Sequence, residues 1–313
     1  MSTCATVSRD LGEPISGTAA TATTWLLLEQ PGPWGAKALV SSHLDPVLGR
    51  ALETAAQGTG VRVALIRRPG RHADVGAPRL RQVYAAHTVP GRVWLHSATT
   101  HDPRQLLDLD FAALGLGDHH TFDRALRGRP HAGDPLALVC TNGKRDRCCA
   151  LLGRPLAAEL AASGVRGTWE VTHLGGHRFS PTLLVLPHGY AYGRAEAHTV
   201  KEVLHGVQEG RIVVEGCRGS SAWERPGQAA ELAVRAAIGE DAAEALSVVR
   251  TTGGAPRWEV TVAHTDGRHW QVDVVQGDSQ PPRPESCGTS VLGSPARMDV
   301  VAVRELAGAA PAV

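Results

Sequence analysis

The stretch from residue 135 to residue 209 constrains the fold of this chain most. It contains apolar runs of strand length, amphipathic runs of helix length and turn-forming residues between them. Strand, helix, strand, hairpin and helix is the element order of a thioredoxin-type domain. The sequence therefore predicts an α/β domain over residues 131–212. We expect its elements at 135–140 (strand), 150–163 (helix), 168–173 (strand), 182–193 (hairpin) and 198–208 (helix).

A second α/β lobe is expected over residues 1–130, because 313 residues are about twice the usual domain size. A strand at 24–29, a helix that opens at Asp45-Pro46 and a strand at 61–66 give this lobe its order. A further helix is predicted at 101–117. The strand–helix–strand outline matches that of the central domain, so a degenerate thioredoxin-like lobe is an alternative interpretation.

Residues 213–313 are predicted to form a small α+β lobe. An Ala-rich helix is expected at 226–238, and Asp266-Gly267 is typical of the turn of a short hairpin. The Pro-, Ser- and Gly-rich residues 279–295 read as a loop before a last strand at 299–304.

Charge and apolar content exclude several classes of protein. A formal net charge of +1 gives no electrostatic reason to expect a nucleic-acid binder or a polybasic membrane protein. No apolar run approaches the ~20 residues that span a bilayer, and no signal peptide is visible, so we expect a cytoplasmic protein. A basic stretch is read as a solvated face, with partner docking as the alternative; it comprises Arg67, Arg68, Arg71, Arg79 and Arg81.

Two motifs carry the chemistry of the central domain. Cys140 ends the first strand and precedes Cys148-Cys149, and His173-Leu-Gly-Gly-His177 follows the second strand. Two thiolates and two imidazoles can close a four-ligand site around zinc or a [2Fe–2S] cluster. The two glycines make a helix unfavourable and allow positive φ, so the loop can turn both rings towards one point.

Alternatives remain open at this site. A zinc-stabilised binding module is one, although the C-x2–4-C spacing of zinc knuckles is missing. A thiol oxidoreductase that uses Cys148 or Cys149 is another, although no C-x-x-C is present. Cys4, Cys217 and Cys287 have no motif partner and are expected to be free buried thiols; their mutual pairing or a second site remains open.

The segments CTNGKRDRCCALLGRPLA, WEVTHLGGHRFSPTLLVLP and YAYGR resemble the sucrase/ferredoxin-like proteins, whose fungal members include the actin-patch-distribution proteins. The resemblance implies a thioredoxin-like ferredoxin domain with a [2Fe–2S] cluster on two Cys and two His. It assigns the ligands to Cys140, His173, His177 and, counting from Arg145-Asp146, Cys149, with Cys148 in reserve. The implied function is electron transfer between redox partner proteins rather than catalysis on a substrate, without nucleic acid or membrane.

Other residues are expected to surround these ligands. Three basic side chains close to Cys149 can dock an acidic partner, or they are ordinary solvated charges; they are Lys144, Arg145 and Arg147. No pair of carboxylates supports a glycosidase, despite the name of the family. The surrounding residues that we expect are Lys144, Arg145, Asp146, Gly175, Gly176 and Arg178.

Overall fold

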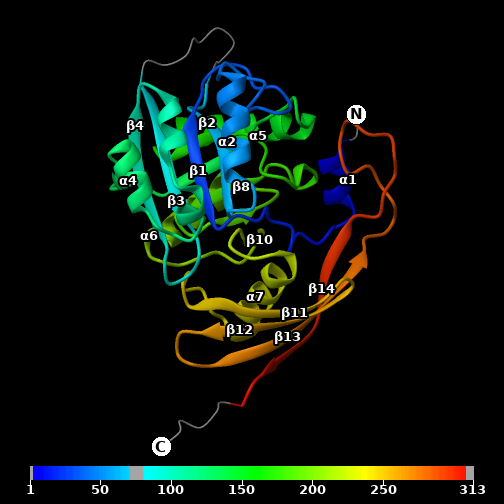
Figure 1. Cartoon of the computed structure of the whole chain (residues 1–313). Coiled ribbons are helices and arrows are strands. Elements are labelled where there is room, and N and C mark those ends of the chain that lie inside the picture. The colour runs from blue at the N-terminus through cyan, green and yellow to red at the C-terminus, as the bar shows by residue number, and fades with distance from the viewer. Residues whose placement is uncertain (1–2, 71–79, 308–313) are drawn as a thin grey trace, which may run out of the picture.

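One large mixed sheet and one small antiparallel sheet organise the chain (Figure 1). The computed structural model describes residues 3–70 and 80–307. The large sheet has ten strands in the order β10-β9-β8-β6-β7-β2-β1-β3-β4-β5. Its strands are β1 (Thr24–Glu29), β2 (Val61–Arg67), β3 (Arg81–His87), β4 (Trp94–Thr100), β5 (Arg129–Pro130), β6 (Leu136–Cys140), β7 (Thr168–Val171), β8 (Leu183–Leu186), β9 (Tyr190–Tyr192) and β10 (Cys217–Ser220).

The helices connect and cover these strands. They are α1 (Cys4–Asp10), α2 (Pro46–Ala56), α3 (Phe111–Gly115), α4 (His120–Leu126), α5 (Arg147–Ala162), α6 (Ala197–Gln208) and α7 (Arg225–Ile238), with short 3-10 turns η1 (Pro103–Asp108) and η2 (His177–Phe179). Asp45 and Asp146 cap α2 and α5 by accepting a backbone N–H with their side chains. The predicted α/β fold is therefore confirmed.

The two halves of the large sheet have the same strand order. β1 and β2 are parallel, β3 is antiparallel to β1, and β4 is antiparallel to β3. In the second half β6 and β7 are parallel, β8 is antiparallel to β6, and β9 is antiparallel to β8. The element order predicted for a thioredoxin-type domain is thus present in the second half, and the first half repeats its strand arrangement.

A short seam between β2 and β7 joins the halves. The two strands are antiparallel and pair through Ile66 with Val171 and Arg67 with Glu170. The Arg67 Nη2 and Glu170 Oε2 atoms are 2.7 Å apart, and each side chain is only 4% exposed. Just beyond β7, the backbone N–H of Thr172 donates to the carbonyl of Leu65 over 3.0 Å. The expected first and central lobes therefore share one sheet.

Alternating residues of the strands supply three apolar cores. One set packs against α2, α3 and α4 in the first half, and another packs against α5 and α6 in the second. The third core draws residues from both halves, among them Trp25, Leu138 and Trp169. Cys140 and Cys149 belong to this shared core, so their thiols lie deep in the molecule.

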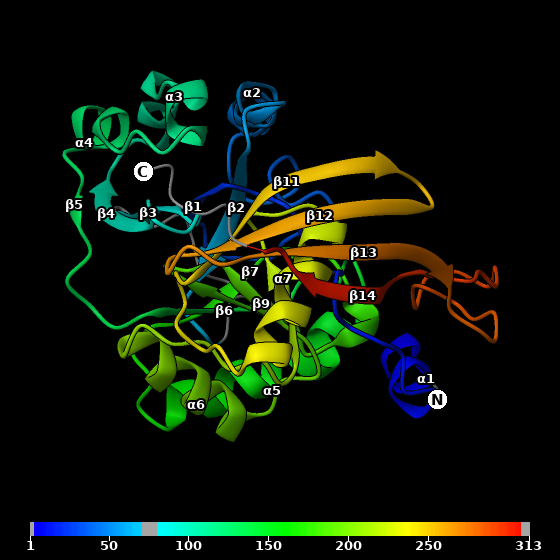
Figure 2. The same cartoon turned by 90° about the horizontal axis from the view of Figure 1, so that it is seen from below.

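The remaining strands form a separate sheet that packs against α7 (Figure 2). Apolar residues of α7 and of the four strands share one core. The predicted hairpin about Asp266-Gly267 and the loop at 279–295 are confirmed. The strands of this sheet are β11 (Leu246–Gly254), β12 (Arg257–His264), β13 (His269–Asp278) and β14 (Ala296–Glu305).

Two expectations for the flanking regions are wrong, and the strands β3 and β11 were not predicted. The helix expected at 101–117 is two short pieces, η1 and α3. The basic stretch is not a solvated face throughout: Arg67 and Arg81 are buried because each guanidinium binds an acceptor on the neighbouring strand. Arg71 and Arg79 lie outside the described residues. Within residues 3–70 and 80–307, no helix is long and apolar enough to cross a membrane.

Candidate metal centre

Three of the four predicted ligands meet at one edge of the large sheet. Cys140 is the last residue of β6, and His173 follows the parallel strand β7, so both leave the sheet at the same edge. Cys149 lies in the first turn of α5, which begins beside that edge. The two Sγ atoms and a ring nitrogen of His173 all lie within 4.8 Å of one another, so these groups could hold a metal ion.

His177 lies beside this group of three but is not part of it. Its ring centroid is 5.4 Å from that of His173, with the planes 35° apart. Its Nε2 lies 2.6 Å from the carbonyl oxygen of Glu285 and 3.4 Å from Oδ2 of Asp146. In metal sites a ligating histidine typically donates its second ring N–H to such an oxygen. That contact leaves Nδ1 of His177 available as a ligand atom.

The hydrogen bonding of the buried histidine ring nitrogens indicates whether a metal ion or cluster fits this site. The Nδ1 atoms of His173 and His177 are both buried and have no hydrogen-bond partner among the described residues. A buried polar atom without a partner costs about 1–3 kcal/mol, so native structures usually satisfy such atoms. Together with the two fully buried thiols of Cys140 and Cys149, these nitrogens provide donors of the soft and borderline type that zinc and iron–sulfur clusters use. The residues present therefore fit a metal centre.

The hydrogen bond between the two thiols of this centre shifts their pKa values in opposite directions. The Cys149 thiol donates to Cys140, and together with His173 it lowers the pKa of the Cys140 thiol well below its usual value despite burial. The same bond and burial raise the pKa of Cys149. Burial lowers the pKa of His177, and the nearby Asp146 carboxylate opposes that effect only in part. Cys140 is therefore ready to act as a thiolate ligand, and His177 is neutral, as a ligating imidazole must be.

A family model described as sucrase/ferredoxin-like matches residues 15–219. The chain belongs to this family. The match includes Cys140, Cys149, His173 and His177. No curated protein and no solved structure shows a significant match to the chain. The predicted family membership is therefore confirmed.

In this member of the sucrase/ferredoxin-like family, the histidine loop takes the backbone shape that its glycines predicted. Gly175 and Gly176 have φ of +83° and +68°. Gly176 is also confined sterically, since a Cβ there would lie 2.1 Å from Nη2 of Arg218. Arg218 is 1% exposed, and its Nη1 donates to the carbonyl of Gly175 over 3.2 Å. The loop is therefore built around a buried arginine.

Cations that the sequence did not single out stand close to the site. Nη2 of Arg62 donates to the carbonyl of His173 over 2.9 Å, and both Arg62 and Arg218 interact electrostatically with Cys140. Burial, with a smaller effect of Arg178, lowers the pKa of Arg218 to about 10, so it stays charged at neutral pH. An arginine in a strand that is 111 residues from His173 carries no sequence signal for such a role. The surroundings of the centre are therefore electropositive.

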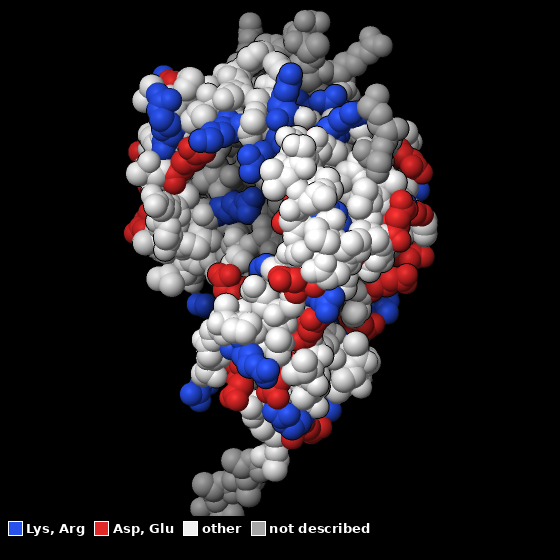
Figure 3. All heavy atoms as spheres, turned by 90° about the vertical axis from the view of Figure 1, so that its right-hand side faces the viewer, with Lys and Arg blue, Asp and Glu red and all other residues white. Residues whose placement is uncertain are grey.

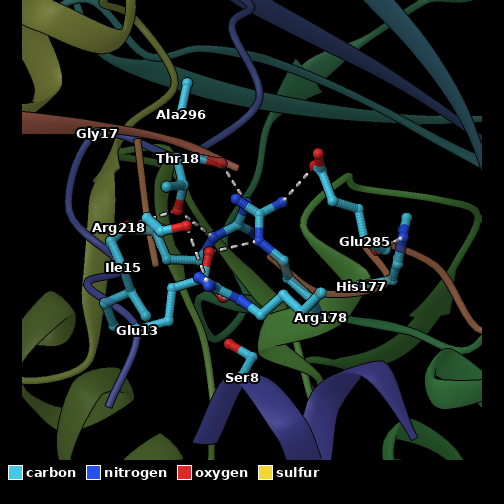
Figure 4. A network of polar contacts seen from close by, with 12 residues as sticks. Ser8, Glu13, Ile15, Gly17, Thr18, His177, Arg178, Arg218, Glu285 and Ala296 are labelled. Atoms are coloured by element: carbon cyan, nitrogen blue, oxygen red, sulfur yellow. Dashed lines mark hydrogen bonds and ion pairs between the residues drawn. The ribbon is translucent and has the colours of Figure 1, made fainter. Parts of the chain in front are cut away.

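Arg178, expected beside the ligands, faces a polar network on the outer side of the loop (Figure 4). Its Nε donates to Oε1 of Glu13 over 2.7 Å, and its Nη1 is 3.6 Å from Oε2 of Glu285. Burial opposes ionisation of Glu13, but the bond and charge of Arg178, with the bonds of Ser8 and Arg283, lower the pKa of Glu13. Figure 4 shows Arg178 and Arg218 together in this network, with His177 at its edge.

The other residues expected around the ligands divide into two groups. Lys144, Arg145 and Arg147 are exposed, whereas Asp146 is buried. Asp146 accepts the backbone N–H of Cys148 with Oδ1 over 2.9 Å, which caps α5. Figure 3 shows Lys and Arg side chains gathered around a hollow on the upper part of one face of the molecule. The exposed Lys144, Arg145 and Arg147 themselves give the start of α5 a basic surface.

Cys148, the reserve ligand, belongs to a different group of side chains. Its Sγ lies 3.3 Å from that of Cys4 and 3.1 Å from that of Cys287, while Cys149 faces Cys140. Cys217 stays a free thiol in the core of the second half, as expected. A third group, His96, His119 and Asp123, also has metal-ligating side chains within 4.8 Å, but both rings already bond to the carboxylate over 2.8 Å.

Proposed function

We propose that this chain is an electron-transfer protein that holds a [2Fe–2S] cluster on Cys140, Cys149, His173 and His177. The observation that carries the proposal is the convergence of two buried thiols and one imidazole, with a second imidazole just outside the group. A single ion needs all its ligands around one point, whereas a two-iron cluster spreads them over two metal positions. The offset position of His177 supports the second case, and the name of the family agrees with it.

The cluster would supply reversible one-electron transfer, and two imidazole ligands place Rieske-type potentials at roughly −150 to +300 mV against about −400 mV for all-Cys plant-type centres. The residues of this chain would tune that exchange. The Arg62 and Arg218 cations interact with Cys140, so they favour the state that carries more negative charge. Glu285, through its carbonyl, would hold the ring of His177 in orientation.

Partner proteins are needed at both ends of such a transfer. The exposed Lys144, Arg145 and Arg147 beside the start of α5 are suited to an acidic reductase or acceptor. We place the reaction in the cytoplasm, where thiols remain reduced.

A zinc-binding module is the second candidate. The observation that favours it is the tight spacing of Cys140, Cys149 and His173, which one ion can span. A thiol oxidoreductase has less support, because reactive cysteines are partly exposed and the thiols of Cys140, Cys148 and Cys149 are fully buried.

Metal analysis and a visible spectrum of the full chain, purified anaerobically, test the proposal. We expect a red-brown protein with about two irons and two acid-labile sulfides per chain. Cys140→Ser and Cys149→Ser should lose the iron, while the matched control Cys217→Ala should keep it, because Cys217 lies in a separate core. A colourless wild type with zinc bound to these four residues would overturn the proposal. Loss of the iron in Cys148→Ser but not in Cys149→Ser would refute the ligand assignment.

A further inference from the structure

Three cysteines far apart in the chain meet at the start of α5. Cys4 is the first residue of α1, Cys148 lies in the first turn of α5, and Cys287 lies in the loop that links β13 to β14. Their Sγ atoms are 3.3 Å (Cys4–Cys148), 3.1 Å (Cys148–Cys287) and 3.5 Å (Cys287–Cys4) apart. Figure 1 shows α1 beside that loop, on the same side of the molecule.

A carboxylate completes this group. Oδ1 of Asp146 lies 3.9 Å from Sγ of Cys4, and one ligand atom from each of the four residues lies within 4.8 Å of all the others. Three donors hold the carboxylate in place: the backbone N–H of Cys148 at 2.9 Å, the hydroxyl of Ser286 at 2.8 Å and the backbone N–H of Cys287 at 3.0 Å. Ligating carboxylates are typically fixed by such bonds.

Neither simple packing nor a disulfide accounts for the arrangement. The three Sγ separations lie at or below the lower end of the roughly 3.5–4.0 Å that is optimal even for two carbon atoms. All three cysteines are free thiols, and a disulfide could use only two of them. A tetrahedral zinc ion with Zn–S bonds of about 2.3 Å places its sulfurs about 3.8 Å apart. The thiols need to separate by about 0.3–0.7 Å to reach that geometry.

We propose that Cys4, Cys148, Cys287 and Asp146 form a second metal site that binds one zinc ion. Carboxylates are accepted zinc ligands, and four protein ligands with no open position are typical of a structural rather than a catalytic zinc. Binding would release the protons of the thiols, and the N-terminus of the 16-residue helix α5 would stabilise the resulting negative charge.

The place of this site in the chain suggests what it does. Cys4 and Cys287 lie outside residues 15–219, which the family model matches, whereas Cys148 lies inside them. The zinc would therefore fasten α1 and the loop at 279–295 to the family domain. That loop also carries Glu285, whose carbonyl contacts Nε2 of His177. The ion would thus fix the loop that carries Glu285, and so the contact of Glu285 with His177, without being part of the first metal centre.

Of the consecutive residues Cys148 and Cys149, Cys148 would bind the zinc of the second site and Cys149 would bind the metal of the first centre. Cys148 Sγ contacts Cys4 and Cys287, while Cys149 Sγ lies with Cys140 and His173. The second site does not depend on the identity of the metal in the first, so the two proposals can fail separately.

The test measures iron and zinc together in the full chain, produced with both metals supplied. We expect about one zinc per chain in the wild type, and loss of that zinc in Cys4→Ser and in Cys287→Ser with the iron and visible spectrum retained. Cys217→Ala is the matched control and should keep both metals, because its thiol is in a different core. Cys287 is in a half-exposed loop, so its replacement does not threaten folding.

Other results would overturn the second site. They are a wild type without zinc, a zinc content unchanged in Cys4→Ser and Cys287→Ser, or loss of iron in place of zinc in these variants. A readout independent of metal counting is alkylation of Cys287. We expect it to be slow in the zinc-loaded protein and at least about tenfold faster after chelation, since a metal-bound thiolate is not free to react. Equal rates before and after chelation, or a disulfide between any two of these cysteines, would also refute it.

Discussion

Replacing each glycine of the histidine loop with alanine separates two forces that shape the metal centre. Gly175 and Gly176 have similar positive φ, +83° and +68°, so an alanine at either position adopts a left-handed backbone. A Cβ at Gly175 would meet nothing within 4 Å, whereas a Cβ at Gly176 would lie 2.1 Å from Nη2 of Arg218. Gly175→Ala is therefore the matched control for Gly176→Ala.

The expected costs differ because of Arg218. Gly175→Ala should reduce the free energy of unfolding by about 1–2 kcal/mol, the penalty of the left-handed conformation. Gly176→Ala adds displacement of a buried guanidinium that donates to Oγ1 of Thr18 at 3.1 Å and to the carbonyl of Gly175 at 3.2 Å. Each buried hydrogen bond left unmade costs about 1–3 kcal/mol, so with the left-handed penalty we expect a total loss of about 3–8 kcal/mol.

Urea unfolding followed by far-UV circular dichroism measures both losses, and the visible spectrum reports the metal centre. Gly176→Ala should also lower the metal content, because Arg218 can no longer support the loop between His173 and His177. Equal destabilisation by the two substitutions would refute the idea that Arg218 shapes this loop. So would a Gly176→Ala variant that is as stable as the wild type.

Three further predictions concern protons and buried charge. If imidazoles ligate the cluster, its reduction potential should fall as the pH rises and they lose their outer protons, and a redox titration that is flat from about pH 6 to 10 contradicts this. Burial, with a smaller effect of Arg92, lowers the pKa of His87 from 6.5 to about 4. The unfolded chain therefore takes up this proton first as the pH falls, and about 3 kcal/mol of stability should be lost between pH 6.5 and 4. His87→Gln should show a smaller loss in urea unfolding over that range, and an unchanged loss would contradict the assignment. Glu231 and Arg235 form an ion pair with both side chains fully buried. Glu231→Gln should cost about 3–5 kcal/mol of unfolding free energy by leaving Arg235 unpaired, and Glu231→Gln with Arg235→Met should cost less. An equal loss in the single and double variants would show that the unpaired charge is not the cause.

Local sequence signals predicted the second half of the sheet well. The apolar run that ends on Cys140, the helix after Asp146 and the glycines before His177 each have a local physical cause, and each is where the sequence placed it. The same signals predicted that Cys140 and His173 lie at one edge of the sheet, because the parallel strands that carry them end together, and Cys149 joins them there.

What the sequence could not predict depends on distant contacts. The strand β3 (RQVYAAH) contains Arg81, Gln82 and His87, which look polar but form hydrogen bonds with groups elsewhere in the sheet. Arg62 and Arg218 reach the centre from separate strands of the large sheet, and no local pattern marks them. The meeting of Cys4 with Cys287 joins the two ends of the chain, and only folding reveals it.

Strand β2, which borders the second half of the sheet, also contacts the segment that carries His173. β2 pairs with β7 through two residues, and beyond that pairing Leu65 bonds to Thr172 while Arg62 bonds to the carbonyl of His173. A shear that parted these two strands would move the histidine loop before it broke the longer pairings inside either half. The halves are therefore mechanically coupled at the residues that would carry the chemistry. Residues 131–212 separated from the rest of the chain would expose a bare sheet edge beside the centre and would not be expected to keep it intact.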